Sequence, residues 1–129
     1  MKNYATTFGA TFGLLAVILG AMGAHALKSE LSTEQLESFQ TGVRYQMYHA
    51  IMLFIIANRK DANDKLLNTI STLFIIGVFL FSFSIYLLST RTITGIEGLS
   101  ALGPITPIGG LFLISGWIIL LYAAIRKKI

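Results

Sequence analysis

Long apolar runs alternate with short polar stretches along the chain. Uncharged and mostly apolar residues fill 4–27, 66–90 and 107–125, and the range 41–58 is apolar in its second half. A helix needs about 20 such residues to cross the roughly 30 Å hydrocarbon core of a bilayer. The pattern therefore predicts an all-α membrane protein, with four transmembrane helices over these ranges in a single domain spanning residues 1–129.

The first apolar run also has a rival interpretation as a secretory signal. Ala24-His25-Ala26 has the small-x-small form of a signal cleavage site, whereas the run itself is longer than the apolar core of a typical signal peptide. On length, we expect a membrane helix over 4–27.

Small residues recur on one face of this first helix. Gly9, Gly13, Ala16, Gly20 and Ala24 fall within roughly 80° of one another at about 100° per residue. Such a stripe lets a neighbouring helix approach closely in a membrane. It is also a candidate surface for a homo-oligomer. The glycines that we assign to helix packing are Gly9, Gly13, Gly20, Gly109, Gly110 and Gly116.

A polar stretch with helix-start signals precedes the second span. Ser32 followed by Gln35 has the form of a capping box. We expect a short interfacial helix over about 33–40, near the lipid headgroups. Gly42 is a candidate bend if this helix continues into the second span.

The start of the fourth span is marked by proline. Thr106 before Pro107 matches an N-cap residue followed by proline at the first helical position. We expect the fourth helix to begin at Pro107, after a loop over 91–103.

Composition and charge support a membrane location. The 129 residues are 54% hydrophobic and 12% charged, whereas a soluble domain carries about twice that charged fraction. The net charge is +4, but the basic residues lie between and after the apolar runs, where membrane proteins carry them. We therefore expect membrane lipids as partners and no nucleic acid. The absence of cysteine excludes disulfides and thiolate sites.

The distribution of lysine and arginine predicts an orientation. With four spans, both termini share a side with the polar turn at 59–65. The seven basic residues on that side are Lys2, Arg59, Lys60, Lys65, Arg126, Lys127 and Lys128, and the three on the other side are Lys28, Arg44 and Arg91. Because positive charge favours the cytoplasm, we expect a multi-pass protein with both termini cytoplasmic.

Polar or helix-breaking residues from all four spans converge on the predicted outer side. The candidate ligand-binding residues are His25, Arg44, Tyr45, Gln46, Tyr48, His49, Ser84, Tyr86 and Thr106. Hydrocarbon makes such side chains costly unless they find partners. Two interpretations stay open. The cluster is either an outer-leaflet pocket for a lipid headgroup or small molecule, or a hydrogen-bonded network that only locks the bundle, as in a structural or partner-binding subunit.

Catalytic chemistry has little support in the sequence. The chain has two histidines, no cysteine and no carboxylate within its predicted spans, which disfavours a metal site and a nucleophilic triad. We therefore expect no catalytic residue, no metal and no cofactor. Trp117, in the fourth span, is assigned to packing.

Four motifs, in order, carry a resemblance to a known family. They are Gly20-Ala-Met-Gly-Ala-His-Ala-Leu27, Thr41-Gly-Val-Arg-Tyr-Gln-Met-Tyr-His-Ala50, Phe81-Ser-Phe-Ser-Ile-Tyr-Leu-Leu88 and Gly103-Pro-Ile-Thr-Pro-Ile-Gly-Gly110. With Gly116-Trp117 they make the chain similar to the domain-of-unknown-function 423 family of small bacterial membrane proteins, which has transmembrane protein 256-like relatives in eukaryotes. Met22 and Phe83 depart from the family pattern. The resemblance implies a four-helix protein of the bacterial inner membrane and implies no activity.

Overall fold

The computed structural model describes residues 2–60 and 63–129 and consists of helices joined by short turns. In chain order the elements are α1 (Lys2–Ala24), α2 (Thr33–Ala57), α3 (Asp64–Val78), the π-helical turn η1 (Phe79–Phe83), α4 (Ser84–Ser89), α5 (Arg91–Thr94), the 3-10 helix η2 (Glu97–Leu102) and α6 (Ile105–Ile125). No strand occurs among the described residues, so the predicted all-α class is confirmed.

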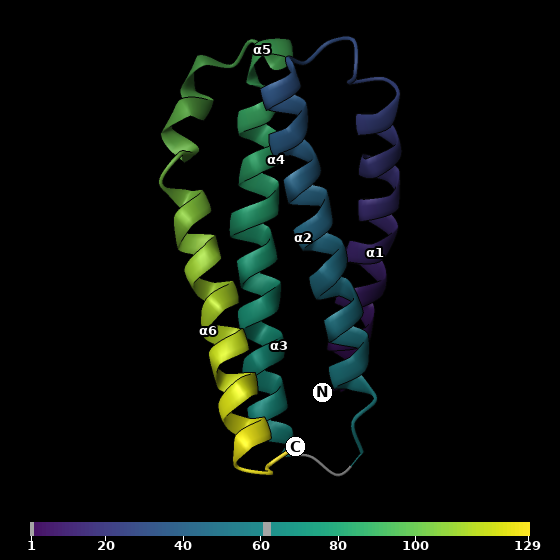
Figure 1. Cartoon of the computed structure of the whole chain (residues 1–129), viewed down its shortest axis with the longest axis vertical. Coiled ribbons are helices and arrows are strands. Elements are labelled where there is room, and N and C mark those ends of the chain that lie inside the picture. Colours follow the sequence, from purple (N-terminus) through teal and green to yellow (C-terminus); the bar gives the residue numbers. More distant parts are fainter. Residues whose placement is uncertain (1, 61–62) are drawn as a thin grey trace.

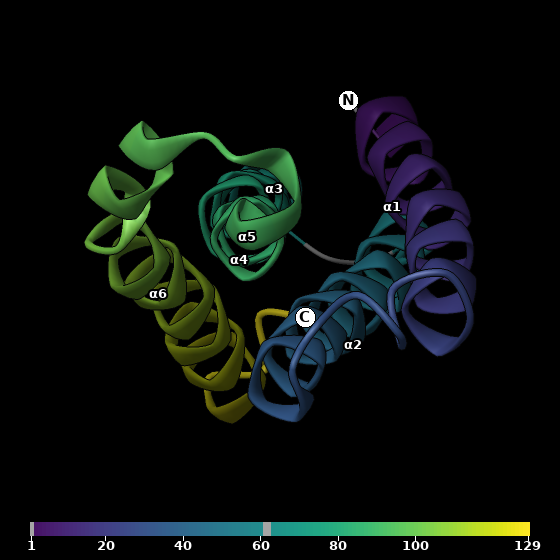
Figure 2. The same ribbon diagram turned by 90° about the horizontal axis from the view of Figure 1, so that it is seen from above.

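The helices α1, α2 and α6 and the stretch from α3 to α4 run up and down (Figure 1). The elements α3, η1 and α4 form one unbroken rod, which we call the α3–α4 rod. The α1–α2 turn, α5 and η2 lie at one end of the molecule, which we call the α5 end, and both termini lie toward the other end. Seen from above, α1 and α6 lie at opposite ends of the arrangement, with α2 and the α3–α4 rod between them (Figure 2).

The α3–α4 rod forms the centre of the fold. In its most apolar stretch 56% of residues are buried inside the molecule, against 22% in α1 and in α6. Phe12 of α1, Leu53 of α2 and Phe74 of α3 are almost wholly buried in the core between these helices. The two outer helices therefore present large apolar surfaces, as expected for helices surrounded by lipid.

Three helical stretches in the described part of the chain are long and apolar enough to cross a membrane. They are Tyr4–Ala24, Lys65–Ser89 and Glu97–Ile125. The helix α2 has 25 residues but does not meet this criterion. Its N-terminal half carries charged and polar side chains, including Glu34, Arg44 and Gln46, which lower its mean hydropathy.

The structure corrects the division of residues 33–58 into two helices. Residues 33–57 form one continuous helix, α2, without a break at Gly42, and Asn58 is its C-cap. A Cβ on Gly42 would lie 2.8 Å from Cε1 of Tyr86, so this glycine admits the tyrosine ring and does not bend the helix. The predicted capping box is confirmed, because the backbone N of Gln35 donates to Oγ of Ser32 at 3.2 Å and the reciprocal bond is 3.0 Å long.

Helix ends near the α5 end also differ from the prediction. The helix α6 begins at Ile105 with Pro104 as its cap, so the predicted start at Pro107 is wrong. Thr106 does not cap the helix, because its hydroxyl bonds to the hydroxyl of Ser84 at 2.6 Å. The predicted loop over 91–103 contains α5 and η2, and the first helix ends at Ala24 instead of residue 27.

Glycines allow the closest helix contacts. Gly9 of α1 lies against the backbone of Ala50, where a Cβ would be 3.1 Å from the carbonyl oxygen, and Gly20 faces Val43. Gly109 of α6 lies directly on the backbone of Phe81 in η1, and Gly116 lies on the ring of Phe74. The glycines of the α1 stripe, Gly9, Gly13 and Gly20, therefore face α2, whereas Ala24 at its end is exposed. The helix α6 approaches the α3–α4 rod closely at the π-helical turn.

Candidate functional site

Gln46 lies at the centre of a buried network that links three helices. Its side chain is fully buried. Its Nε2 donates to the carbonyl of Phe12 in α1 at 2.8 Å, and its Oε1 accepts from the hydroxyl of Tyr86 in α4 at 2.7 Å. Because a carbonyl can only accept, this pairing fixes the orientation of the amide. Both ends of the carboxamide are therefore used within the fold.

Ser82 adds the π-helical turn to this network. Its hydroxyl donates to the carbonyl of Gly42 at 2.7 Å. We call Gln46, Tyr86, Ser82 and the carbonyls of Phe12 and Gly42 the Gln46 network. Within the described residues, no buried side-chain nitrogen or oxygen lacks a hydrogen-bond partner. The network thus satisfies its own polar groups, which is what a hydrocarbon environment requires.

His49 makes a second, separate contact between helices. Its Nε2 is 3.1 Å from Nε1 of Trp117 in α6, and its Nδ1 is 2.7 Å from the carbonyl of Tyr45. Because the indole N–H can only donate, Nε2 must accept and Nδ1 must carry the proton. His49 is therefore held as a neutral imidazole with both nitrogens occupied. His49 comes 16 residues after Thr33, the first residue of α2, which is about 24 Å along the helix axis. It therefore lies farther from the α5 end than Gln46 does.

An apolar hollow opens beside this histidine between α2 and α6. Its volume is about 240 Å³. Its lining consists of Tyr45, His49, Phe81, Gly110, Leu113, Ile114 and Trp117. Tyr45 and Trp117 are 41% and 44% exposed, so the hollow reaches the outer surface of the bundle. We call it the α2–α6 hollow.

The other predicted candidates do not join one pocket. Ser84 and Thr106 bond to each other between α4 and α6. His25 and Tyr48 are exposed. Arg44 is exposed as well, and its Nη2 donates to the hydroxyl of Thr41 at 3.2 Å, one turn closer to the α5 end. The nine predicted residues are thus distributed among several places, of which the α2–α6 hollow takes Tyr45 and His49.

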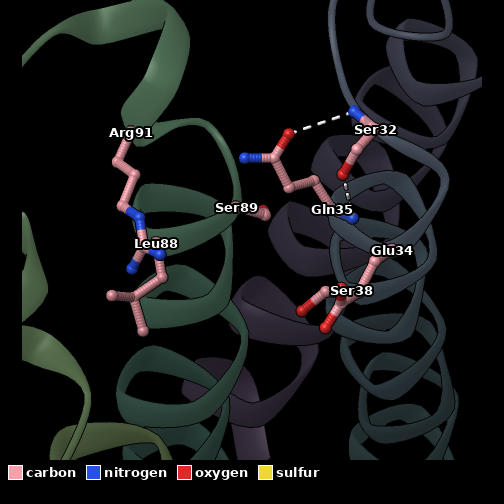
Figure 3. Close-up of a pocket in the computed structure, with 7 residues that line it drawn as sticks. All are labelled: Ser32, Glu34, Gln35, Ser38, Leu88, Ser89 and Arg91. Carbon is pink, nitrogen blue, oxygen red and sulfur yellow. Dashed lines mark hydrogen bonds between the residues drawn. The ribbon is translucent and has the colours of Figure 1, made fainter.

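A polar groove of about 430 Å³ lies between α2 and the end of α4 (Figure 3). Its lining consists of Ser32, Glu34, Gln35, Ser38, Leu88, Ser89 and Arg91. In Figure 3 Arg91 extends along α4 on one wall, and Glu34 and Ser38 project from α2 on the other. The side-chain Nε2 of Gln35 donates to the hydroxyl of Thr92 at 3.3 Å and so connects α2 to α5. We call this the α5-end groove.

The groove and the hollow lie on the same face of α2. Glu34, Ser38, Tyr45 and His49 are spaced at i, i+4, i+11 and i+15, which places them within roughly 60° around the helix axis. Thr41, which accepts the bond from Arg44, lies on this face between groove and hollow. About 10 Å separates Ser38 from Tyr45 along the axis. A long molecule lying along this face of α2 would therefore contact both sites.

Sequence reasoning missed the residues that complete these two sites. Trp117 was assigned to packing. An indole N–H in apolar surroundings usually needs a hydrogen-bond acceptor, so the sequence did contain a signal that Trp117 has a polar partner. Arg91 was counted only for orientation, and Glu34 was not singled out. Whether these two residues line the same groove depends on how α2 and α4 lie side by side, which the sequence pattern does not specify.

Comparison with known proteins places this fold in a family. The family model described as "Protein of unknown function (DUF423)" matches residues 19–110. The chain belongs to the DUF423 family. This match covers α2 and the α3–α4 rod, with the α5-end groove, part of the α2–α6 hollow and all of the Gln46 network except Phe12. It confirms the resemblance carried by the four motifs.

Curated relatives of this DUF423 chain are membrane proteins by name. A UPF0382 membrane protein of Bacillus subtilis is 42% identical over 120 residues, which is 92% of this chain and 93% of the relative. A UPF0382 membrane protein of Haemophilus influenzae is 35% identical over 128 residues, 99% and 98% of the two chains. A UPF0382 inner membrane protein of Escherichia coli is 32% identical over 128 residues, 98% and 93% of the two chains. No solved structure matches the chain. We conclude that the chain is a helical membrane protein of a family without an assigned activity.

Proposed function

We propose that this protein spans the bacterial inner membrane four times and binds one membrane lipid, whose hydrocarbon chain occupies the α2–α6 hollow. The observation that carries the proposal is the hollow itself. It is apolar, it is lined by the rings of Tyr45, Phe81 and Trp117, and it opens on the outer surface of the bundle. An apolar depression that faces lipid gains dispersion contacts when hydrocarbon fills it, because an empty one leaves its lining atoms without partners.

The position of Arg44 indicates which end of the hollow the lipid headgroup occupies. The guanidinium of Arg44 is held at Thr41, about one turn from Tyr45 on the side of the α5 end. Lysine and arginine side chains in membrane helices extend toward the headgroups. The lipid phosphate therefore lies toward the α5 end, and its chain extends toward His49 and Trp117.

The fourth span in this proposal is α2. With 25 residues it is about 37 Å long, enough to cross the hydrocarbon core. Its buried polar side chains Gln46 and His49 do not require water at that depth, because they bond to α1, α4 and α6. Four spans place both termini beside the seven basic residues, so we propose that both termini are cytoplasmic.

Fluorescence of Trp117 tests lipid binding directly, because it is the only tryptophan. A phospholipid with brominated acyl chains is titrated into the full chain in detergent. We expect saturable quenching at about one lipid per chain. Gly110→Phe fills the hollow and should abolish the saturable phase. A Cβ at Gly110 would lie 3.8 Å from the ring of Phe81, so the position has room for a side chain.

Leu111→Phe is the matched control for this experiment. It adds the same ring at the next position of α6, on a side chain that is 62% exposed and does not line the hollow. It should leave the saturable quenching unchanged. Quenching that rises in proportion to the lipid-to-detergent ratio, equally in the unmodified chain and in Gly110→Phe, would refute the lipid site.

A second candidate is a structural or partner-binding subunit. The saturated Gln46 network favours it, since it has the bonding of a lock between helices. Self-association would need a surface other than the glycine stripe of α1, because α2 covers Gly9 and Gly20. Native mass spectrometry of protein extracted from its own membrane distinguishes the candidates. One retained lipid on a single chain supports lipid binding, whereas a second protein chain without lipid supports the subunit.

A further inference from the structure

Two opposite charges lie on opposite walls of the α5-end groove without contact. Glu34 lies on the α2 wall and Arg91 on the α4–α5 wall, with open space between them (Figure 3). Within the described part of the chain, neither side chain has a hydrogen bond or an ion pair. The groove thus offers a carboxylate and a guanidinium that the protein itself leaves uncompensated.

This pair of charges selects for a particular kind of ligand. An anion bound to Arg91 would be repelled by Glu34, and a cation bound to Glu34 would be repelled by Arg91. A zwitterion with its charges a few atoms apart satisfies both walls. Electrostatic complementarity of this kind contributes to specificity more than to total affinity.

The chemistry of the groove also separates two kinds of zwitterion. A primary ammonium can donate hydrogen bonds to the Glu34 carboxylate and to the hydroxyl of Ser38. A quaternary ammonium has no N–H and is typically bound by cages of aromatic rings, and no aromatic residue lines the groove. A primary ammonium is therefore the better fit.

Building on the proposed lipid site, we infer that its ligand is a phospholipid with a phosphoethanolamine headgroup, held in the α5-end groove. The phosphate lies at Arg91 and the ammonium at Glu34. The chain follows the shared face of α2, past Thr41, into the α2–α6 hollow. Leu88, two turns from Phe81 on the opposite wall, gives the glycerol end an apolar contact between groove and hollow.

Headgroup selectivity in the Trp117 quenching assay tests this inference. Brominated lipids with phosphoethanolamine, phosphocholine and phosphoglycerol headgroups are titrated into the full chain in detergent. We expect up to roughly fivefold tighter binding of the phosphoethanolamine lipid, the upper end for an ion pair between exposed groups. Glu34→Gln should remove the preference over phosphoglycerol, and Arg91→Gln should weaken all three lipids, with Arg91→Lys restoring part of the loss.

Two controls use charges at the same end of the molecule. Glu37→Gln removes a carboxylate one turn further along α2, and Lys28→Gln removes a cation on the α1–α2 turn, and neither residue lines the groove. Both should leave the headgroup preference unchanged. Free phosphoethanolamine, which has no hydrocarbon chain, should not displace the lipid at equal concentration, and displacement would overturn the identification of the ligand as a lipid.

Failure of this inference differs from failure of the proposed function. Equal affinity for the three headgroups, with quenching still abolished by Gly110→Phe, would overturn the headgroup assignment and leave the lipid site standing. Loss of saturable quenching for every lipid in the unmodified chain would overturn both.

Discussion

At the scale of single residues, the buried polar side chains in the middle of α2 differ from the charged ones in the α5-end groove. The buried ones have all their hydrogen-bonding groups occupied, and the charged ones do not. Gln46 uses both ends of its amide, and His49 uses both ring nitrogens, so each fixes a neighbouring helix. Glu34 and Arg91 differ, because their charged groups lie on opposite walls of a groove and bond to no other group among the described residues. The saturated residues therefore stabilise the fold, and the unpaired charges are the ones available to a ligand.

Coupling between Gln46 and Tyr86 provides a residue-scale prediction. Gln46→Leu and Tyr86→Phe should each destabilise the protein by about 0.6–2 kcal/mol, because each leaves a buried polar partner unpaired. The free energy of unfolding of the double variant should fall by clearly less than the sum of the two single losses. In the double variant neither the tyrosine hydroxyl nor the glutamine amide remains to be left unpaired. Unfolding in mixed detergent micelles measures the free energies.

Tyr48→Phe removes an exposed hydroxyl on the same helix and serves as the control. It should change stability little. Strict additivity of the two buried substitutions would contradict the hydrogen bond between them.

At the scale of elements, the π-helical turn η1 and α6 fit together through one glycine. Gly109 lies on the backbone of η1 at Phe81, where a Cβ would collide with main-chain atoms that cannot rotate away. The neighbouring Gly110 lies beside the α2–α6 hollow and has space for a Cβ. Two adjacent glycines thus have different roles, one in helix contact and one in keeping the hollow open.

Alanine substitutions distinguish these two roles. Gly109→Ala should destabilise the protein by about 1–3 kcal/mol through overpacking. Gly110→Ala should be neutral or stabilising by up to about 1 kcal/mol, because alanine has the higher helix propensity. Thermal unfolding in detergent measures both. Equal destabilisation of the two variants would show that α6 does not approach η1 as closely as described.

At the scale of the whole molecule, the position in the bilayer is the main question. The outer helices α1 and α6 present large apolar surfaces, as helices surrounded by lipid do. The α5 end carries the α1–α2 turn, α5 and η2, and both termini lie toward the other end (Figure 1). The groove and the hollow lie along one face of α2, with the groove nearer the α5 end of the molecule. The orientation of the molecule decides which leaflet these two sites face.

Cysteine accessibility tests the orientation, because the chain has no cysteine of its own. Ser29→Cys lies on the α1–α2 turn and Lys60→Cys follows the end of α2, and both positions are exposed. In intact cells whose outer membrane has been made permeable, a membrane-impermeant maleimide should label Ser29→Cys only. Labelling of Lys60→Cys alone would reverse the topology, and labelling of neither before lysis would show that α2 does not cross.

The amino-acid pattern by itself determined the all-α class, the positions of three apolar helices and the capping box at Ser32, because helix periodicity and capping are local properties. It did not determine that 33–57 is one helix, since Gly42 looks like a break until the ring of Tyr86 is seen against it. Nor could it predict the contact of His49 with Trp117, or that Glu34 and Arg91 line the same groove. Those pairs depend on the rotation and depth of each helix against its neighbours, which close packing at Gly9, Gly109 and Gly116 sets only in the folded bundle.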